Sequence, residues 1–459
     1  MPCTPYDCLA STVAHRWPPS GGCAASRKLQ RVAARCARCS DNAADARLLC
    51  TQRPALLWIT WLTANISLWM NDVAAAWLMT TLTTSPAWVA LVQTAATLPV
   101  LLLGLPSGVL ADALERRRLL LLTQVWAALV ALLLVLTVKL EALTPALLLA
   151  LVFANGIGLA LRWPVYAALM PHLVPRAQLP AALALNGVSM NVSRIVGPLL
   201  AGLIIAALGS EWVFALNALL AVGCAALIWR WRSPVCPKPA PREPFWSALR
   251  VGVRFVAESP RLRLAYLQVG LFFFHSAALI GLLPLLALRF EGASASTFTW
   301  LLAAMGSGAI LSALYLPRLR RGHSRAFMVW AGMALQALAM LVVTWAPGLW
   351  AALLAMFVAG MAWIAVANTL NVAAQFAMPD WVRARAISVY QMALMGGAAL
   401  GAAAWGKLAH WVGVPLSVSL AALSALCLAT LTLRWSQRSR LLEDPGPEGA
   451  DREAEPPLQ

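Results

Sequence analysis

Twelve long apolar runs follow one another through most of this 459-residue chain, and they limit its possible folds more than any other feature. The hydrocarbon core of a bilayer is about 30 Å thick, so a helix needs about 20 apolar residues to cross it. The predicted spans are residues 55–81, 86–111, 119–138, 144–168, 181–208, 211–231, 262–288, 297–316, 326–346, 348–375, 386–411 and 414–434. Only 12% of the residues are charged, too few to cover a soluble protein of this length. The sequence therefore predicts an all-α membrane protein with twelve transmembrane helices in contact with lipid.

The basic residues, which give a net charge of +17, are concentrated in alternate connections between these spans. One set of connections carries Arg116 to Arg118, Arg176, eight Lys or Arg from Arg230 to Arg263, Arg318 to Arg325, and Arg383 with Arg385. The other set carries only Lys139 and Arg289. Basic loops stay on the cytoplasmic side of a membrane, so we expect a multi-pass protein of the bacterial inner membrane with both termini in the cytoplasm. The distribution of basic residues is therefore explained by the orientation of the protein in the membrane, and no nucleic-acid partner is expected.

The two ends of the chain differ from its apolar body. Residues 1–53 have no hydrophobic periodicity and hold six of the nine cysteines. We expect a disordered cytoplasmic segment, or a stretch before a true start near Leu48. Cys36 and Cys39 have the spacing of half a zinc site, but a second matching pair is missing, so no metal is expected. Residues 436–459 are rich in Pro and acidic residues and are expected to form a disordered cytoplasmic tail.

The body of the chain divides into two related halves. Residues 54–232 and 262–435 are each predicted to form a six-helix bundle, and residues 233–261 a cytoplasmic linker. The amphipathic run 245–257 in that linker is either a membrane-surface helix or a plain connection. At an offset of 204 the glycines repeat in the pairs Gly156 and Gly360, Gly197 and Gly401, Gly202 and Gly406, and Gly209 and Gly413. Two pseudo-symmetric bundles around a central path form a transporter architecture.

A short, charged segment joins the second and third predicted spans. It contains Gly108, Asp112, Arg116, Arg117 and Arg118, and it is expected to be a turn that gates the path. We expect Asp112 to pair with Arg116 or with the positive N-terminal end of a helix from the other half. The alternative is a simple positive-inside anchor.

The spacing of a glycine, an aspartate four residues later and a basic pair resembles the signature loop of the major facilitator superfamily. Ala113 and Glu115 depart from that pattern.

The fifth predicted span is expected to have a kink and close helix packing at Gly197, Pro198 and Gly202. This stretch resembles the glycine and proline motif of drug antiporters in the same superfamily, although Ser193 and Ala201 replace two of its glycines. The alternative is an ordinary kinked helix.

Residues 50–435 as a whole resemble the enterobactin-exporter-like branch of that superfamily, the transmembrane secretion effectors. The stretches Trp69 to Met79 and Pro379 to Arg385 carry much of the likeness. The resemblance implies the major facilitator fold, alternating access and proton-driven export. It leaves the substrate open among siderophores, macrolides and other compounds.

Three charged side chains lie at least six residues from either end of a predicted span, and a charge costs at least about 2.5 kcal/mol at mid-bilayer. They are Asp72, Arg162 and Arg194. We hypothesise that Asp72 pairs with one of the arginines and that its protonation couples proton entry to transport. The alternatives are a permanent ion pair that locks the first bundle and, for Arg162, a side chain that extends to the interface.

Polar and aromatic side chains on helical faces are expected to line a substrate path between the halves. The set is Asn65, Trp69, Asn155, Tyr166, Gln268, Phe272, His275, Asn368 and Gln391. Such a lining suits a small amphipathic molecule. We expect a monomer without a cofactor, and not an enzyme, because no phosphate-binding loop or catalytic motif occurs. An importer and a non-transporting sensor or scaffold remain as alternatives.

Overall fold

The computed structural model describes residues 43–439, apart from 114, 174–178, 232–252, 291, 293, 320–321 and 379–382. Its described part contains twelve long helices. They are α3 (Ala43–Leu82), α4 (Pro86–Ala113), α5 (Arg116–Lys139), α6 (Pro145–Leu173), α7 (Leu179–Ala207), α8 (Ser210–Arg230), α10 (Pro260–Ala287), α11 (Ala295–Leu319), α12 (Arg325–Trp345), α13 (Leu349–Phe376), α14 (Arg383–Val412) and α15 (Val414–Ser439).

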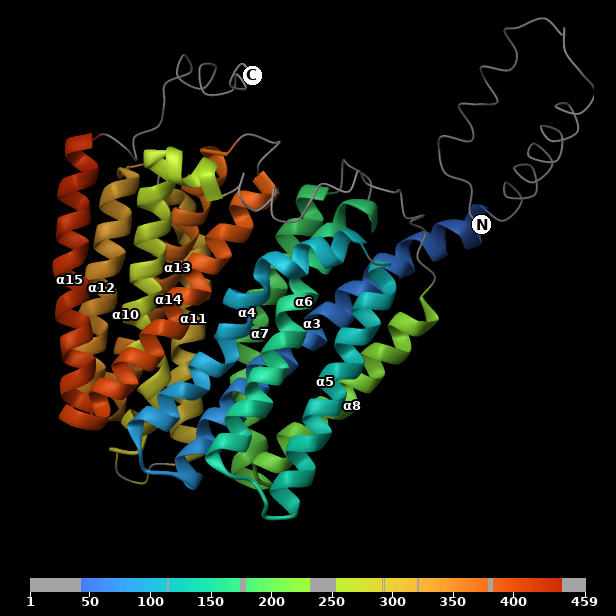
Figure 1. The fold of residues 1–459 in the computed structure, drawn as a ribbon, viewed down its shortest axis with the longest axis horizontal. Helices are drawn as coiled ribbons and strands as arrows, with labels where there is room; N and C mark the ends of the chain where they lie inside the picture. The colour runs from blue at the N-terminus through green and yellow to red at the C-terminus, as the bar shows by residue number, and fades with distance from the viewer. Residues whose placement is uncertain are drawn as a thin grey trace, which may run out of the picture.

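These helices form two bundles of six, α3 to α8 and α10 to α15, which lie side by side (Figure 1). Eleven of the helices are long and apolar enough to cross a bilayer. The remaining one, α3, is also long enough, but polar residues such as Asn65, Asn71 and Asp72 lower its hydropathy. Helix α3 begins and α15 ends at the same end of the molecule, which we call the terminal end (Figure 1). The prediction of twelve helices in two bundles is confirmed.

The repeated glycines occupy equivalent helix crossings in the two bundles. A Cβ atom at Gly156 of α6 would lie 2.8 Å from the Ala96 carbonyl oxygen of α4, and one at Gly360 of α13 would meet the Met305 carbonyl of α11. Likewise, Gly197 brings α7 against α3, and Gly401 brings α14 against α10. Only glycine permits such close backbone approach. The internal repeat in the sequence therefore corresponds to a repeat in three-dimensional packing.

The two bundles contact each other along α4 and α14, from the end opposite the termini as far as Gly104 and Met392. At the end opposite the termini, Gly202 of α7 packs against Thr299 of α11, and Gly406 of α14 packs against Ala90 of α4. The Trp77 and Phe298 rings stack with their centroids 6.4 Å apart, joining α3 to α11. Toward the terminal end the first bundle leans away from the second (Figure 1). The structure is thus closed at the end opposite the termini.

Several predicted boundaries need correction. Helix α4 continues to Ala113 and α5 begins at Arg116, so the segment 108–118 is mostly helical rather than a turn. Helix α3 begins twelve residues before its predicted start at residue 55, within the segment expected to be disordered. Residues 1–42 and 440–459 and most of the linker lie outside the described residues. The described end of the amphipathic run, residues 253–258, is helical, and it buries Val256 in the core of the second bundle.

Candidate substrate and coupling site

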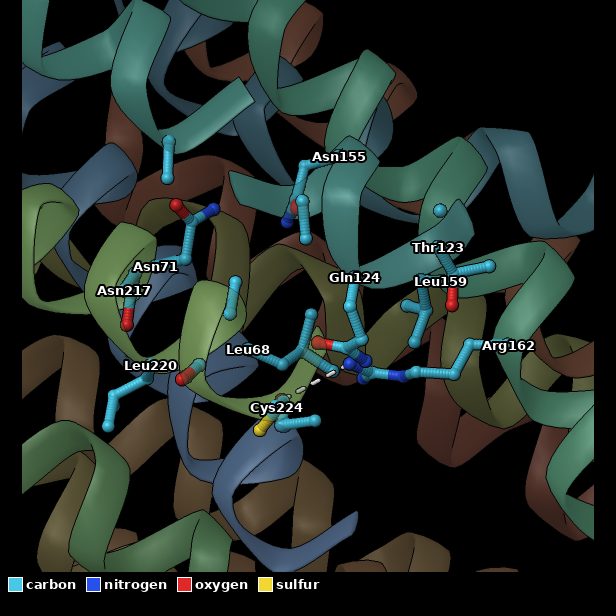
Figure 2. A pocket seen from close by; sticks show the side chains of 16 residues that line it. Leu68, Asn71, Thr123, Gln124, Asn155, Leu159, Arg162, Asn217, Leu220 and Cys224 are labelled. Carbon is cyan, nitrogen blue, oxygen red and sulfur yellow. Dashed lines mark hydrogen bonds between the residues drawn. The ribbon is translucent and has the colours of Figure 1, made fainter. Parts of the chain in front are cut away.

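A small polar cavity lies inside the first bundle, between α3, α5, α6 and α8 (Figure 2). Its volume is about 40 Å³. Its polar lining comes from Ser67, Asn71, Thr123, Gln124, Asn155, Arg162, Asn217 and Cys224. Figure 2 shows the Arg162 side chain reaching across the cavity toward Gln124, with Asn71 and Asn217 on the far side. The cavity therefore lies within one half and not between the halves.

Arg162 is buried, with 8% of its surface exposed, and does not extend to the interface. Its Nη1 atom donates a hydrogen bond to the Ala64 carbonyl oxygen at 3.4 Å. Its guanidinium carbon lies 5.7 Å from the centre of the Trp61 ring, which stacks on Tyr166 at 3.7 Å. Asn155, which was predicted to line a path between the halves, lines this cavity beside Arg162, because their face of α6 is turned toward α5 and α8.

Asp72 lies near the middle of α3, partly buried. It forms no ion pair with Arg162 or Arg194, contrary to the hypothesis from the sequence. The reason is the stagger of the helices, since Gly197 of α7 lies level with Ile66 to Met70 of α3. At 1.5 Å per residue this stagger places Asp72 and Arg194 about 10 Å apart along the helix axes. The carboxylate therefore has no charged partner among the described residues.

Arg194 instead lies over the indole ring of Trp69, with its guanidinium carbon 5.2 Å from the ring centre. Such a contact contributes about 2 kcal/mol when it is shielded from water. The Nε and Nη1 atoms of Arg194 are buried without hydrogen-bond partners in the described part of the chain. Pro198, four residues later, has no N–H, so the Arg194 carbonyl oxygen loses its helical partner. That oxygen faces Gly306 of α11, where a Cβ would lie 3.4 Å away.

Gln268, Phe272 and His275, three of the five predicted lining residues of the second bundle, are buried on α10. Gln268 and His275 are 2% and 4% exposed, and the His275 Nδ1 atom lies 2.7 Å from the Leu271 carbonyl oxygen. The Gln268 Oε1 atom has no partner among the described residues. Phe272 packs edge-on against Phe273 and Trp363. Asn368 of α13 and Gln391 of α14 are partly exposed.

In the first bundle, Asn65 is fully buried and donates from its Nδ2 atom to the Trp61 carbonyl oxygen at 2.8 Å. Together with Tyr166 on Trp61, it packs within the bundle. These two predicted lining residues therefore belong to the bundle interior.

Two arginines of the predicted gating segment, Arg117 and Arg118, make their contacts within the first bundle. Arg117 donates to the carbonyl oxygens of Ile228, at 3.2 Å, and of Trp229, and so caps the C-terminal end of α8. Arg118 pairs with Glu115 at 2.7 Å. The side chain of Asp112 lies outside the described residues, so its predicted pairing with Arg116 or with the other half stays a prediction.

The sequence interpretation missed Asn71, Gln124, Asn217 and Cys224, which face the cavity. A signal for three of them was present in the internal repeat. At the offset of 204, Gln124 corresponds to Met328, Asn217 to Ala421 and Cys224 to Leu428. Polar residues in one half that correspond to apolar residues in the other half mark a feature that the fold itself does not need.

Solved structures similar to this fold include transporters. A bacterial homologue of the human lysosomal transporter Spinster, in an inward-facing and unoccupied conformation, matches with a TM-score of 0.70 over 86% of this chain and 99% of that one, at 16% identity. The nucleoside transporter NupG matches with a TM-score of 0.68 over 86% of this chain and 100% of its own, at 14% identity. A family model that matches most of the chain agrees with this fold, and the two together define a secondary transporter of the major facilitator superfamily, and not an enzyme.

Within that superfamily, the chain belongs to the transmembrane secretion effector family, whose model matches residues 49–452. The MFS-type transporter YfiS of Bacillus subtilis is 27% identical over 76% of this chain and 84% of its own length. The multidrug efflux pump Tap of Mycolicibacterium fortuitum is 26% identical over 83% of this chain and 96% of its own. The enterobactin exporter EntS of Shigella boydii is 31% identical over 45% of this chain and 49% of its own.

Proposed function

We propose that this protein is a proton-driven exporter that moves a small amphipathic molecule across the inner membrane of a bacterium by alternating access. It acts as a monomer, with both termini in the cytoplasm. The observation that carries this proposal is the partly buried Asp72 carboxylate, which has no charged partner among the described residues. An unpaired carboxylate inside a membrane helix is costly unless it takes up a proton or a ligand.

The coupling step follows from the position of Asp72 on α3. Trp69 lies one turn away on the same helix and contacts Arg194 of α7. When Asp72 is ionised, the nearest candidate cation is Arg194, and drawing the two together requires that Arg194 leaves the Trp69 ring. When Asp72 is protonated, this attraction vanishes and Arg194 returns to the ring. Proton binding is thereby linked to the contact between α3 and α7.

The proposed orientation rests on the distribution of basic residues. The terminal end carries Arg116, Arg117, Arg118, Arg318 and Arg325, whereas the opposite end carries Lys139 and Arg289. Under the positive-inside rule the terminal end is cytoplasmic. A molecule closed at the opposite end is then closed toward the outside, which is the state that accepts a substrate for export.

Export, rather than import, is favoured by the names of two relatives, the multidrug efflux pump Tap and the enterobactin exporter EntS. An amphipathic substrate is favoured by the mixture of aromatic and polar side chains proposed to line the path. Trp69, Asn368 and Gln391 of this set are partly exposed in this structure, and Gln268, Phe272 and His275 are buried. Such a mixture provides apolar surface with a few hydrogen-bonding groups.

The test is mass-spectrometric profiling of small molecules inside and outside efflux-deficient cells. The cells express the wild type, Asp72→Asn, or the control Glu141→Gln, which neutralises an exposed carboxylate in the turn between α5 and α6. We expect compounds that leave the cell only with the wild type or the control, and only without an uncoupler. If compounds instead accumulate inside the cells, the protein is an importer and the proposed direction is wrong. If Asp72→Asn transports as well as the wild type, the proposed coupling role of Asp72 is wrong.

A further inference from the structure

We infer that the cavity between α3, α5, α6 and α8 is a binding site for a small inorganic anion, for which chloride is the natural candidate. The ligands would be the Arg162 guanidinium and the side-chain amides of Asn71 and Asn217, all of which line the cavity (Figure 2). This site is separate from the proposed substrate path and does not depend on the proposed direction of transport.

The charge of the cavity is the first argument. Arg162 is the one charged side chain among the sixteen lining residues, and none of them is an aspartate or glutamate. Its guanidinium is more than nine-tenths buried, and its Nε atom has no hydrogen-bond partner in the described part of the structure. A buried cation without a counter-charge is strongly unfavourable in a low-dielectric interior. An anion in the cavity would remove that cost.

The second argument is the supply of unused N–H donors. Asn71 and Asn217 are each 5% exposed, and their Nδ2 atoms have no partner among the described residues. Buried polar groups are normally hydrogen-bonded, so unpaired donors that line the same cavity as a buried cation point to a ligand that accepts hydrogen bonds. The unpaired Oδ1 atom of Asn217 is suited to a water molecule bound beside the anion.

The size of the cavity selects the class of ligand. A volume of about 40 Å³ holds about three water molecules, or one small anion with a water. Organic ligands occupy pockets of roughly 300–1,000 Å³, so a transported metabolite does not fit here.

The second bundle shows that the fold does not require these polar residues. At the repeat offset of 204, the proposed ligand Asn71 corresponds to His275, whereas Asn155, Arg162 and Asn217 correspond to Ala359, Val366 and Ala421. All three of these residues are fully buried in apolar core. The same helix crossings are therefore filled with apolar side chains in one half and surround a cationic cavity in the other.

The experiment measures thermal unfolding of the purified full chain in detergent, in sodium chloride and in sodium gluconate at equal ionic strength. A ligand that binds the folded state raises the melting temperature Tm with the logarithm of its concentration. We expect chloride and bromide to raise the Tm of the wild type by about 3 °C over gluconate. Arg162→Met and Asn217→Leu should abolish this difference.

The control is Gln336→Leu, which removes another buried amide without hydrogen-bond partners among the described residues, on α12 of the second bundle. It should keep the full halide effect. Asn217→Leu preserves both Arg162 and the side-chain volume, so it decides the question if Arg162→Met fails to fold. Equal Tm values of the wild type in chloride and gluconate would show that the cavity holds water only. A halide effect that persists in Asn217→Leu would place the anion elsewhere, and either result overturns the proposal.

Discussion

Gly202 controls how closely the two bundles meet at the end opposite the termini, and a larger side chain there should open this end. A Cβ atom at Gly202 would lie 2.5 Å from the Cβ of Thr299 on α11, far inside van der Waals contact. Gly202→Val adds three carbon atoms at this point, and overpacking of this kind costs about 1–3 kcal/mol. The cost applies to the state in which this end is closed and disappears when α7 and α11 separate.

The equilibrium between the two states should therefore shift by about 5- to 150-fold toward the state that is open at this end. The assay is double electron–electron resonance between spin labels at Thr84, before α4, and Trp411, at the end of α14. We expect the population at longer distance to grow in Gly202→Val. The control is Gly223→Val, because a Cβ at Gly223 of α8 meets nothing within 4 Å. If the two variants give the same distance distribution, the reasoning from Gly202 is wrong.

Two further predictions concern stability. Arg117→Met removes the donors to the α8 carbonyl oxygens and should lower the free energy of unfolding by about 1 kcal/mol. Arg118→Gln, at an exposed ion pair, should change it by less than about 0.5 kcal/mol. Chemical denaturation in detergent measures both values. Gly360→Ala should cost about 3 kcal/mol or more, because the new Cβ meets the backbone carbonyl of Met305 and cannot rotate away. The same assay on Gly223→Ala, which has open space, should show no loss of stability, because alanine has a higher helix propensity than glycine.

The fold was predictable because its determinants are local or repeated. Twelve apolar runs follow directly from the thickness of a bilayer, and the pairs such as Gly156 and Gly360 lie at equivalent crossings. The boundaries were less accurate where helices extend beyond the hydrocarbon region. Helix α4 continues through the polar residues up to Ala113, because backbone hydrogen bonding does not stop where hydrophobicity does.

The site was harder to predict because each helix of a twelve-helix protein has more than one buried face. Periodicity groups Asn155 with Arg162, but it does not say whether their face meets the other half or a neighbour within the same bundle. Asn71 and Asp72 are adjacent in sequence, and about 100° of helical rotation separates their side chains. One of them lines the internal cavity and the other does not. The ion pair proposed for Asp72 failed for a related reason, since the stagger of α3 against α7 depends on packing at Gly197.

The internal repeat separates the residues that serve the fold from those that serve function. Residues that repeat, such as Gly197 with Gly401, hold equivalent helix crossings in both bundles. The buried arginines do not repeat, since Arg162 corresponds to Val366 and Arg194 to Ala398. A residue that the fold needs should recur wherever the same crossing recurs, whereas a residue kept for a ligand or a proton need occur only once. The charged groups within the spans are therefore concentrated in the first bundle, and the second bundle provides much of the apolar surface against which it moves.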